Sequence, residues 1–515
     1  MTNKSVDNAL YNILANVIKI VAVSIISFAI TGVLVRELGQ ELYGVVPLFT
    51  SMNRYIGLIT VVLSASVGRF VSLSYFKGKI DDANKYYSSS FFGLLLIAFL
   101  AFTLFYGFSF FLDVFFQLPI EKFYEVRIFF ILSVTSLLLS SILSTFNVPA
   151  FIKHAFYLTD IVNIFSKIVQ IGFLLFFVRH ITLILFGFSL LSAALVSIIL
   201  TYFISIRILP DLRVKIKNIS SSKLKDMGGM GLNSFFNSLG ILLYTSSDII
   251  IVNVLLGSIE SGRYGIAVQC GMLVTMLGGS VTRLLAPVLV ELIAKDRREQ
   301  LINYIVRFTK LITVFSAIPF MLFVVFSKPL LKFWLGEGFE DLYILIIIVV
   351  SNQLLHQTTS LTFTYFNMRN KLRIPAIMTF IAGLLNIVLS VILVKYTELG
   401  AYGVALGTFI SILLKTIIFN VIYASRLLEI KPLLVWRAVL KGLYWPLILG
   451  GILFILFNLT TIDSILVLIL CMASVLFIYT LSALYLPLSS EDRTLLFKIS
   501  KLDKIKWRTK SSKTY

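Results

Sequence analysis

The chain has 515 residues, of which 58% are hydrophobic and only 14% charged, and its mean hydropathy is +0.96. Soluble domains of this length do not have such a composition, so we predict an all-α polytopic membrane protein. A net charge of +20 would suggest nucleic-acid binding in a soluble chain. In a membrane protein the position of Lys and Arg relative to the bilayer matters instead, and no nucleic-acid partner is expected.

The first stretch of the chain, residues 10–64, predicts a hairpin of two membrane-spanning helices with a turn at residues 36–44. At about 1.5 Å per residue, each arm is long enough to cross a hydrocarbon core of about 30 Å. The first arm carries Lys19 and the second Arg54, each on the more polar face of its helix. Because lipid excludes charge, we expect a hydrophilic ligand to meet these faces inside the membrane.

Apolar runs of spanning length continue along the chain and predict about fourteen transmembrane helices. They lie at residues 10–35, 42–67, 88–112, 128–147, 154–178, 181–205, 229–255, 264–289, 303–327, 342–365, 374–396, 400–423, 438–459 and 464–487. The alternate loops on one side, with the tail, hold about 30 Lys and Arg, whereas the other side holds about 8, so both termini are predicted to be cytoplasmic. These basic inside segments are expected to contact anionic membrane lipid.

Short motifs recur about 220 residues apart. The Leu-Gly and Tyr-Gly pairs of residues 38–45 reappear at 256–266, and Asn163-Ile164 reappears as Asn386-Ile387. Six helices per repeat predict two lobes related by a pseudo-twofold axis along the membrane normal, plus an appended helix pair. The predicted N-terminal lobe, basic cytoplasmic linker, C-terminal lobe, helix pair 13–14 and basic cytoplasmic tail occupy residues 1–210, 211–228, 229–430, 431–487 and 488–515.

Ionisable groups inside the apolar helices cost roughly 2.5 to 3.5 kcal/mol each on an insertion scale, so their presence points to a function. On the fifth helix they form one polar face with Asp160, Asn163, Lys167 and Gln170. Other spans contribute Asn53, Asn237, Asp248, Arg283, Gln353, His356 and Lys415. Polar faces in both lobes predict a shared central cavity in which cations outnumber acids.

Several of these residues also have a structural interpretation. Lys19 and Arg283 can extend toward the headgroups, and Lys167 can pair with Asp160. His356 can be a hydrogen-bonded helix contact rather than a proton relay. Asp248 is the best candidate for ion coupling, and a salt bridge across the lobes is its alternative interpretation.

The two cysteines, Cys270 and Cys471, lie within apolar segments at a spacing that suits neither a disulfide nor a metal site. Each is interpreted as a small buried residue, and no metal or cofactor is expected. The first apolar run is too long for a cleavable signal peptide, so we expect the first helix to remain and span the membrane.

The motifs resemble a known family. The LG-x3-YG turn, its equivalent before helix eight, Trp334-Leu335-Gly336, Leu385-Asn386-Ile387 and the run 399–405 occur in an order that is similar to the polysaccharide biosynthesis (O-antigen) flippases. That family belongs to the multidrug/oligosaccharidyl-lipid/polysaccharide exporter superfamily, and the resemblance covers residues 8–487. It implies a V-shaped pair of lobes in the bacterial cytoplasmic (inner) membrane that flips polyprenyl-pyrophosphate-linked oligosaccharide to the outer leaflet. Other polysaccharide assembly proteins are partners that such a role implies.

The peptidoglycan-precursor flippases are similar relatives that gather the lipid pyrophosphate with basic residues on helices one, two and eight. Lys19, Arg54 and Arg283 fall on the matching helices, although a Lys in the first place offers a point charge rather than a planar fork. The same resemblance implies that helices 13 and 14 line a groove for the polyprenyl tail.

These observations predict a site and a mechanism. Lys19, Arg54 and Arg283 are expected to bind the diphosphate, and Lys167 and Lys415 to add positive charge. Sugar contacts are predicted for Asn53, Asn163, Gln170, Asn237 and Gln353, and ion coupling for Asp248, Asp160 and His356. No G-x4-G-K-S/T loop occurs, so an ion gradient or the membrane potential is the expected drive.

Three other functions compete with this interpretation. A cation-coupled multidrug exporter of the same superfamily should carry acids in its cavity, whereas this chain carries cations there. A peptidoglycan-precursor lipid flippase would use the same diphosphate chemistry. A membrane glycan polymerase or ligase would need a sizeable outer loop, but the longest outside loops have only about 15 residues, so the chain is not expected to be an enzyme.

Overall fold

The computed structural model describes residues 3–177, 180–369, 371–458 and 462–487, and gives only the backbone of some stretches, among them 3–18 and 236–237. All the regular secondary structure in the described part of the chain is helical, as the all-α prediction requires. Its long helices are α1 (Asn3–Phe76), α2 (Ile80–Phe108), α4 (Phe123–Phe146), α6 (Phe156–Phe176), α7 (Leu183–Ile208), α8 (Ser221–Thr245), α10 (Ser258–Ala294), α11 (Arg298–Leu335), α12 (Tyr343–Thr358), α14 (Arg373–Tyr396), α17 (Pro432–Asn458) and α18 (Ile465–Tyr485). The shorter elements are η1 (Ser109–Phe111), α3 (Leu112–Phe115), η2 (Ile120–Lys122), α5 (Val148–Ile152), η4 (Ile216–Asn218), α9 (Ser247–Leu256), η5 (Glu340–Leu342), α13 (Ser360–Met368), α15 (Ala401–Ile412), the π-helix η6 (Leu413–Asn420) and α16 (Val421–Leu428).

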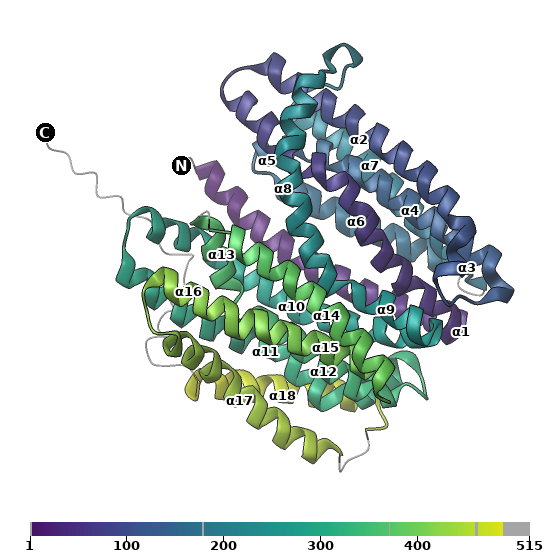
Figure 1. Cartoon of the computed structure of the whole chain (residues 1–515), viewed down its shortest axis with the longest axis vertical. Helices are drawn as coiled ribbons and strands as arrows, with labels where there is room; N and C mark the ends of the chain where they lie inside the picture. The colour runs from purple at the N-terminus through teal and green to yellow at the C-terminus, as the bar shows by residue number, and fades with distance from the viewer. Residues whose placement is uncertain (1–2, 178–179, 370, 459–461, 488–515) are drawn as a thin grey trace, which may run out of the picture.

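The helices gather in two bundles. Figure 1 shows α2, α4, α6 and α7 together in one bundle and α10, α11, α12, α14 and α15 in a second, with α17 and α18 on the outer side of the second. Helices α1 and α8 contact both bundles. The arrangement is that of two packed groups of helices with an appended pair, while the predicted boundaries at residues 210 and 430 stay a prediction.

Helix α1 turns back on itself at Gly39, whose φ of 75° and ψ of 170° are not helical. Lys19 of the first arm contacts Asp160 of α6. Ser64 of the second arm lines the same pocket as Thr159, the residue before Asp160, so both arms lie near the same part of α6. In a straight helix residues 19 and 64 would lie about 68 Å apart. The chain therefore reverses within the predicted turn, and the positive φ explains why a glycine stands there.

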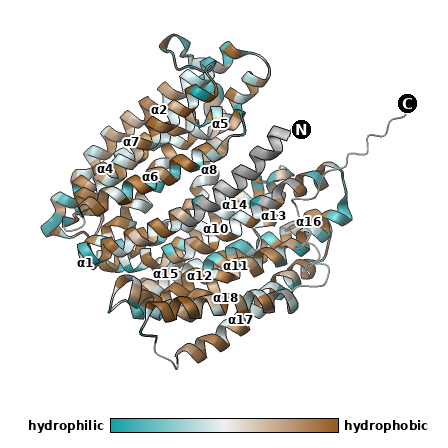
Figure 2. Ribbon diagram, turned by 180° about the vertical axis from the view of Figure 1, so that it is seen from behind, coloured by the Kyte–Doolittle hydropathy of each residue, from teal (hydrophilic) through white to brown (hydrophobic). Residues whose placement is uncertain are grey.

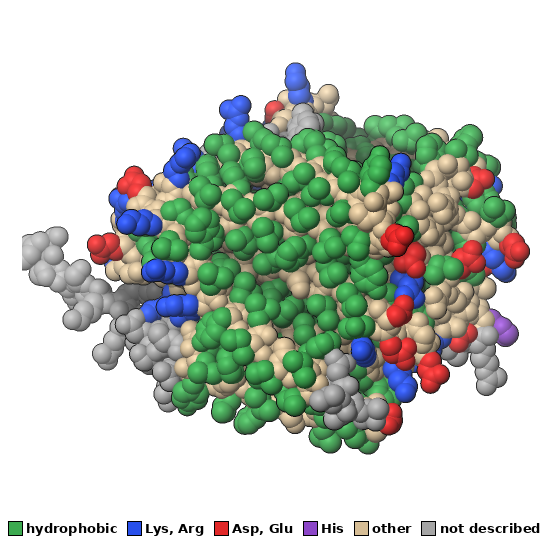
Figure 3. Space-filling view, turned by 60° about the horizontal axis from the view of Figure 1, so that its bottom comes forward, with side chains coloured by type: hydrophobic (Ala, Val, Ile, Leu, Met, Phe, Trp, Pro, Cys, Tyr) green, Lys and Arg blue, Asp and Glu red, His purple; other side chains and the backbone are tan. Residues whose placement is uncertain are grey.

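The outer surface suits a bilayer. Figure 2 shows mostly hydrophobic residues along α2, α7, α17 and α18, and Figure 3 shows a broad hydrophobic face with charged side chains along its two margins. Twelve helices among the described residues are long and apolar enough to span a membrane, or thirteen with the bent pair α8–α9. The predicted number of fourteen is thus not confirmed. This count takes residues 22–76 as one element, although they include the turn at Gly39 and part of both arms.

The repeated Tyr-Gly motifs meet where α1 packs against α10. A Cβ atom added to Gly44 would lie 1.8 Å from the Ser258 carbonyl oxygen, and one added to Gly265 would lie 2.5 Å from Pro47 Cβ. The Ser261 hydroxyl donates to the Gly44 carbonyl oxygen over 3.0 Å. The glycines of the repeat therefore permit the two backbones to approach closely, and they join the two halves of the chain at this end of the molecule.

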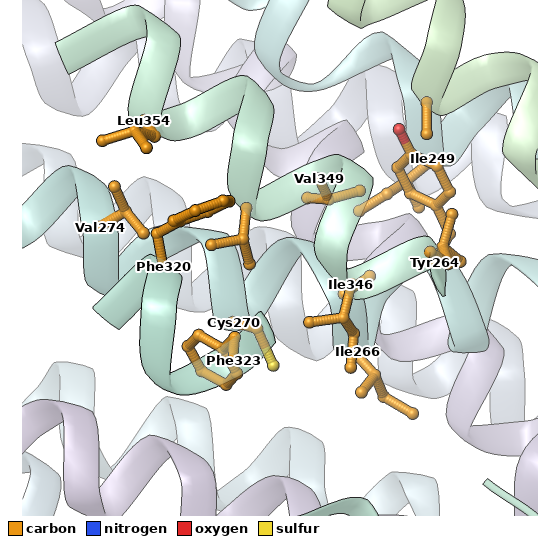
Figure 4. Packing of buried hydrophobic residues seen from close by; sticks show 14 of the residues in the cluster. Ile249, Tyr264, Ile266, Cys270, Val274, Phe320, Phe323, Ile346, Val349 and Leu354 are labelled. Atoms are coloured by element: carbon orange, nitrogen blue, oxygen red, sulfur yellow. The ribbon is translucent and has the colours of Figure 1, made fainter. Parts of the chain in front are cut away.

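A continuous apolar core holds the second bundle together. In Figure 4, Cys270 and Val274 of α10 lie beside Phe320 and Phe323 of α11, with Val349 of α12 nearby. Cys270 is fully buried, as predicted for a small core residue, whereas Cys471 on α18 is partly exposed. Close packing of this kind makes α10, α11 and α12 a rigid support for the polar residues that they carry.

Candidate functional site

One group of polar residues lies on α6. The Lys19 ammonium, on the first arm of α1, is 2.5 Å from Asp160 Oδ1, and the Lys167 ammonium donates to Gln170 Oε1 over 2.7 Å. The suggested pairing of Lys167 with Asp160 is therefore wrong, because Lys19 from another helix takes that carboxylate. Asn163 is exposed on the same helix.

A second group surrounds the break between α8 and α9. The two helices bend by 42° at Ser246, whose φ of −131° departs from helical geometry. From the second arm of α1, Arg54 Nη1 donates to the Ser246 hydroxyl over 3.3 Å, and the Tyr55 hydroxyl donates to the Leu242 carbonyl oxygen over 2.9 Å. The break thus lies against the half-buried guanidinium of Arg54.

On its other side, the end of α8 contacts the second bundle. The Lys415 ammonium lies 4.2 Å from the centre of the Tyr244 ring, and the Tyr244 hydroxyl is 3.2 Å from Nε2 of His356 on α12. Lys415 belongs to the π-helix η6 and is only 6% exposed. A desolvated ammonium over an aromatic face gains about 2 kcal/mol or more, so the ring partly compensates the burial of this cation.

Asp248, at the start of α9, is 6% exposed and accepts hydrogen bonds from three neutral groups. The donors are the Tyr264 hydroxyl (2.8 Å), the Asn386 amide (2.7 Å) and the Thr408 hydroxyl (2.7 Å). Among the described residues Asp248 forms no ion pair, so the interpretation as a salt bridge across the lobes is wrong there. The carboxylate lies in an oxygen-rich polar cage defined by these three partners.

Tyr264, Asn386 and Thr408 are not among the predicted site residues. A signal was present for two of them, since Tyr264 and Asn386 both belong to motifs that recur between the halves of the chain. Residues repeated in two lobes are expected at positions that the architecture needs, and a carboxylate cage is such a position.

The remaining predicted residues lie apart from these groups or are not described. Arg283 is exposed and donates within its own helix to the Gly279 carbonyl oxygen over 3.4 Å. Gln353 accepts from the Thr275 hydroxyl over 2.9 Å, between α12 and α10. Asn53 has a buried Oδ1 atom without a hydrogen-bond partner among the described residues. The side chain of Asn237 lies outside the described part of the structure.

Two adjoining apolar clefts run along the first arm of α1, between α11 and α18. Their volumes are about 500 and 470 Å³, and both are lined by Phe28, Leu330 and Met472. The second cleft ends at Arg36, which donates to the carbonyl oxygens of Phe333 and Trp334 over 3.0 Å each. An extended hydrocarbon chain fits the chemistry of this lining, and a hydrophilic ligand does not.

Comparison with known proteins gives the class of the molecule. A family model described as "Polysaccharide biosynthesis protein" matches residues 33–344. The chain is 28% identical over 497 residues to EpsK of Bacillus subtilis (strain 168), an uncharacterized membrane protein, and the match covers 95% of this chain and 97% of EpsK. It is 24% identical over 324 residues to Agl15 of Haloferax volcanii, described as a probable low-salt glycan biosynthesis flippase, over 60% of this chain and 66% of Agl15.

Solved structures show the same fold. The lipid II flippase MurJ in an inward closed conformation matches with a TM-score of 0.67 and 15% identity, over 94% of this chain and 99% of MurJ. A multidrug resistance MATE transporter of the MOP superfamily, in its inward-facing conformation, matches with a TM-score of 0.59 and 16% identity, over 83% of this chain and 94% of the transporter. The chain is thus a multi-pass membrane protein that shares its fold with MurJ and with this MATE transporter, and it belongs to the polysaccharide biosynthesis protein family.

Proposed function

We propose that this chain flips polyprenyl-pyrophosphate-linked oligosaccharide from the cytoplasmic to the outer leaflet of a bacterial cytoplasmic membrane by alternating access. The observation that carries the proposal is Arg54, a half-buried guanidinium at the α8–α9 break that forms no ion pair among the described residues. A cation that is held inside a membrane protein without an acid suits an anionic ligand. A diphosphate provides that charge and accepts a forked hydrogen bond from Arg.

Lys19 is the second diphosphate ligand in this proposal. Its ammonium is paired with the Asp160 carboxylate. An arriving diphosphate competes with a single carboxylate for Lys19 and brings more negative charge. Lys167 and Lys415 add positive charge from α6 and η6, whereas Arg283 lies outside both groups, so the proposal rests on Lys19 and Arg54.

The lipid tail and the sugars need different surroundings. The apolar clefts beside α18 suit the polyprenyl chain. The family resemblance implies this role for the last helix pair, and of that pair α18 lines the clefts while the described lining includes no residue of α17. Hydroxyls and amides of the sugars lose water inside the membrane and need hydrogen-bond partners there. We propose that Gln170, which contacts Lys167 on α6, and Asn53, which precedes Arg54 in the chain, supply such partners.

We further propose that Asp248 couples transport to an ion gradient. Its three partners are neutral donors, so binding of a proton or a monovalent cation would neutralise a buried charge. The charge of Asp160 is already balanced by Lys19, and His356 contacts the Tyr244 hydroxyl. Asp248 is an acid whose described partners are all neutral, so it is the best-supported coupling residue of the three.

Orientation is also a proposal. In Figure 3 one margin of the hydrophobic face bears mainly Lys and Arg side chains, whereas the other bears most of the Asp and Glu side chains together with some Lys and Arg. Under the positive-inside rule the Lys-rich and Arg-rich margin faces the cytoplasm and contacts anionic lipid, and we propose that both termini are cytoplasmic. Other polysaccharide assembly proteins would then deliver the substrate inside and receive it outside. In this role the chain is a transporter and not an enzyme.

The test is the leaflet distribution of lipid-linked oligosaccharide in cells depleted of this protein, scored with an impermeant sugar-modifying probe. The proposal expects the oligosaccharide to accumulate on the cytoplasmic side. If only the peptidoglycan precursor accumulates there, the protein is a peptidoglycan-precursor flippase. An unchanged distribution together with new sensitivity to cationic dyes would instead make it a cation-coupled multidrug exporter.

A further inference from the structure

A pocket of about 680 Å³ lies between the second arm of α1, the end of α4, α5 and the start of α6. Its polar lining consists of hydroxyls, one amide and one guanidinium. These groups belong to Ser64, Arg69, Ser72, Ser144, Asn147 and Thr159. The size suits one or two sugar rings rather than an ion, and the lining offers the groups that bind sugar hydroxyls and phosphate.

The floor of this pocket continues the helix face that carries Arg54. Positions 54, 57, 61, 64, 68 and 72 follow one another at intervals of three or four residues, so they form one stripe along α1. The Ser72 hydroxyl is on this stripe, is 5% exposed and has no hydrogen-bond partner among the described residues. A buried hydroxyl without a partner is costly, and because Ser72 lines the pocket, rotation of its side chain toward a polar ligand there would relieve that cost.

The pocket also adjoins the other basic residue of the proposed site. Thr159 lines it, and the next residue, Asp160, accepts the hydrogen bond from Lys19. One wall of the pocket therefore leads along α1 to Arg54, and another ends beside the Lys19–Asp160 pair. Exposed Phe151 and Phe156 line it as well and give it an amphiphilic character.

We propose that this pocket is a docking site for the phosphate-bearing sugar head of the lipid-linked substrate, occupied before the diphosphate reaches Lys19 and Arg54. The inference rests on the proposed function, because it places a first binding step of that same transport. A sugar diphosphate on a polyprenyl lipid and the phosphate of an ordinary anionic lipid share part of this chemistry. The proposal is for the former, and the experiments distinguish the two.

Gly68 provides a clean way to fill the pocket. It lines the pocket, and a Cβ atom added there would meet nothing within 4 Å, so Gly68→Leu occupies the space without a clash at Cβ. The matched control is Gly172→Leu, at a helical glycine on α6 with equally open surroundings on an exposed apolar face. We expect Gly68→Leu to lower flipping at least tenfold while Gly172→Leu flips like the wild type.

Binding of inorganic pyrophosphate to the purified full-length protein separates the two proposals. Gly68→Leu should bind this small probe like the wild type, because Lys19 and Arg54 are untouched. If the wild type flips lipid-linked oligosaccharide and Gly68→Leu flips equally fast, the docking site is wrong and the proposed function stands. If depletion leaves the leaflet distribution unchanged and the wild type binds no pyrophosphate, the proposed function fails.

A labelling experiment identifies the ligand. Gly68→Cys, in a chain with Cys270→Ala and Cys471→Ala, is treated with a maleimide in phosphatidylcholine bilayers, with either a short-chain prenyl-diphosphate disaccharide or phosphatidylglycerol added. The proposal expects at least a fivefold slower reaction with the disaccharide lipid alone. Equal protection by phosphatidylglycerol, or protection by neither, would overturn it.

Discussion

Arg54 and Lys19 illustrate two ways in which a membrane protein can keep a cation inside its helices. Arg54 is held by a neutral hydroxyl at a helix break, whereas Lys19 is held by a carboxylate. The difference matters for a ligand, because an anion meets Arg54 without having to displace an acid. The two arrangements therefore lead to different expected effects of substitutions on pyrophosphate binding.

Replacing Arg54 by Ala should weaken binding of inorganic pyrophosphate roughly 10- to 100-fold, because a hydrogen bond to a charged group contributes about 1.5–3 kcal/mol. Arg54→Lys should recover part of this loss, since it keeps the charge but loses the fork. The measurement is a pyrophosphate titration of purified protein whose thermal unfolding matches that of the wild type. Wild-type affinity in Arg54→Ala would remove this residue from the site.

Replacing Asp160 by Asn should strengthen pyrophosphate binding, whereas Lys19→Ala should weaken it. The Asn side chain leaves the Lys19 ammonium without its carboxylate and so available to an anion. The same titration measures both variants. If the pair is only structural, Asp160→Asn will lower stability and leave the pyrophosphate affinity unchanged.

Replacing Asp248 by Asn should abolish the stimulation of flipping by an ion gradient while leaving slow, gradient-independent exchange. The variant keeps the size of the side chain and removes the charge that its three neutral donors surround. Flipping is measured in proteoliposomes with a proton gradient or a sodium gradient imposed. Tyr264→Phe, which removes one donor, should show an intermediate response, and a full response in Asp248→Asn would exclude it as the coupling residue.

At the scale of elements, the hairpin of α1 and the close contact of the repeated motifs organise the molecule. The turn could be predicted because glycine, chain length and apolar character are local properties of the sequence. The motif repeat could also be found in the sequence, but the packing of the two motifs against each other could not. Only the folded chain shows that Gly44 of the first repeat packs against Ser258, and that Gly265 of the second packs against Pro47.

The polar contacts between helices could not be predicted either, because they depend on how distant helices pack. Helical spacing puts Asp160 and Lys167 on one face of α6, but it does not tell which neighbouring helix supplies a partner. Lys19, 141 residues away, reaches Asp160 first. Likewise Asp248 acquires Asn386 and Thr408 from helices more than a hundred residues later in the chain, so its cage is a property of packing.

Replacing Gly44 by Ala should shift the protein toward conformations that are open at the end where α1 meets α10. The new methyl group would collide with the Ser258 carbonyl oxygen, which lies 1.8 Å from the added Cβ. Spin labels at Ile120→Cys and Ile259→Cys, with the native cysteines replaced, report the opening as a longer distance. Gly107→Ala is the control, because nothing lies within 4 Å of its added Cβ, and equal distances in both variants would contradict the prediction.

At the scale of the whole molecule, a polar group and the apolar clefts lie along the same helix, the first arm of α1. The first arm of α1 bears Lys19 and also lines the clefts beside α18. An amphiphile with a charged head and a long tail can therefore contact one helix along its length. Transport should depend on the length of the tail as well as on the charge of the head.

Replacing Met472 by Trp should fill the clefts and reduce flipping of a long-chain polyprenyl substrate several-fold, while a short-chain analogue is flipped at the wild-type rate. Met472 lines both clefts. Leu470→Trp is the control, because Leu470 is exposed on α18 and lines neither cleft. The rates are measured in proteoliposomes with each substrate in turn, and an equal reduction for both chain lengths would argue against a tail groove.

The break between α8 and α9 links diphosphate binding at Arg54 thermodynamically to cation binding at Asp248. Within a few residues it touches Arg54 through Ser246 and carries Asp248. If the bend differs between the conformations that favour each ligand, a cation at Asp248 changes the affinity for the diphosphate by some factor. The diphosphate must then change the affinity for the cation by the same factor. The substrate would thus set how readily the ion binds, and an unloaded carrier would pass few ions down their gradient.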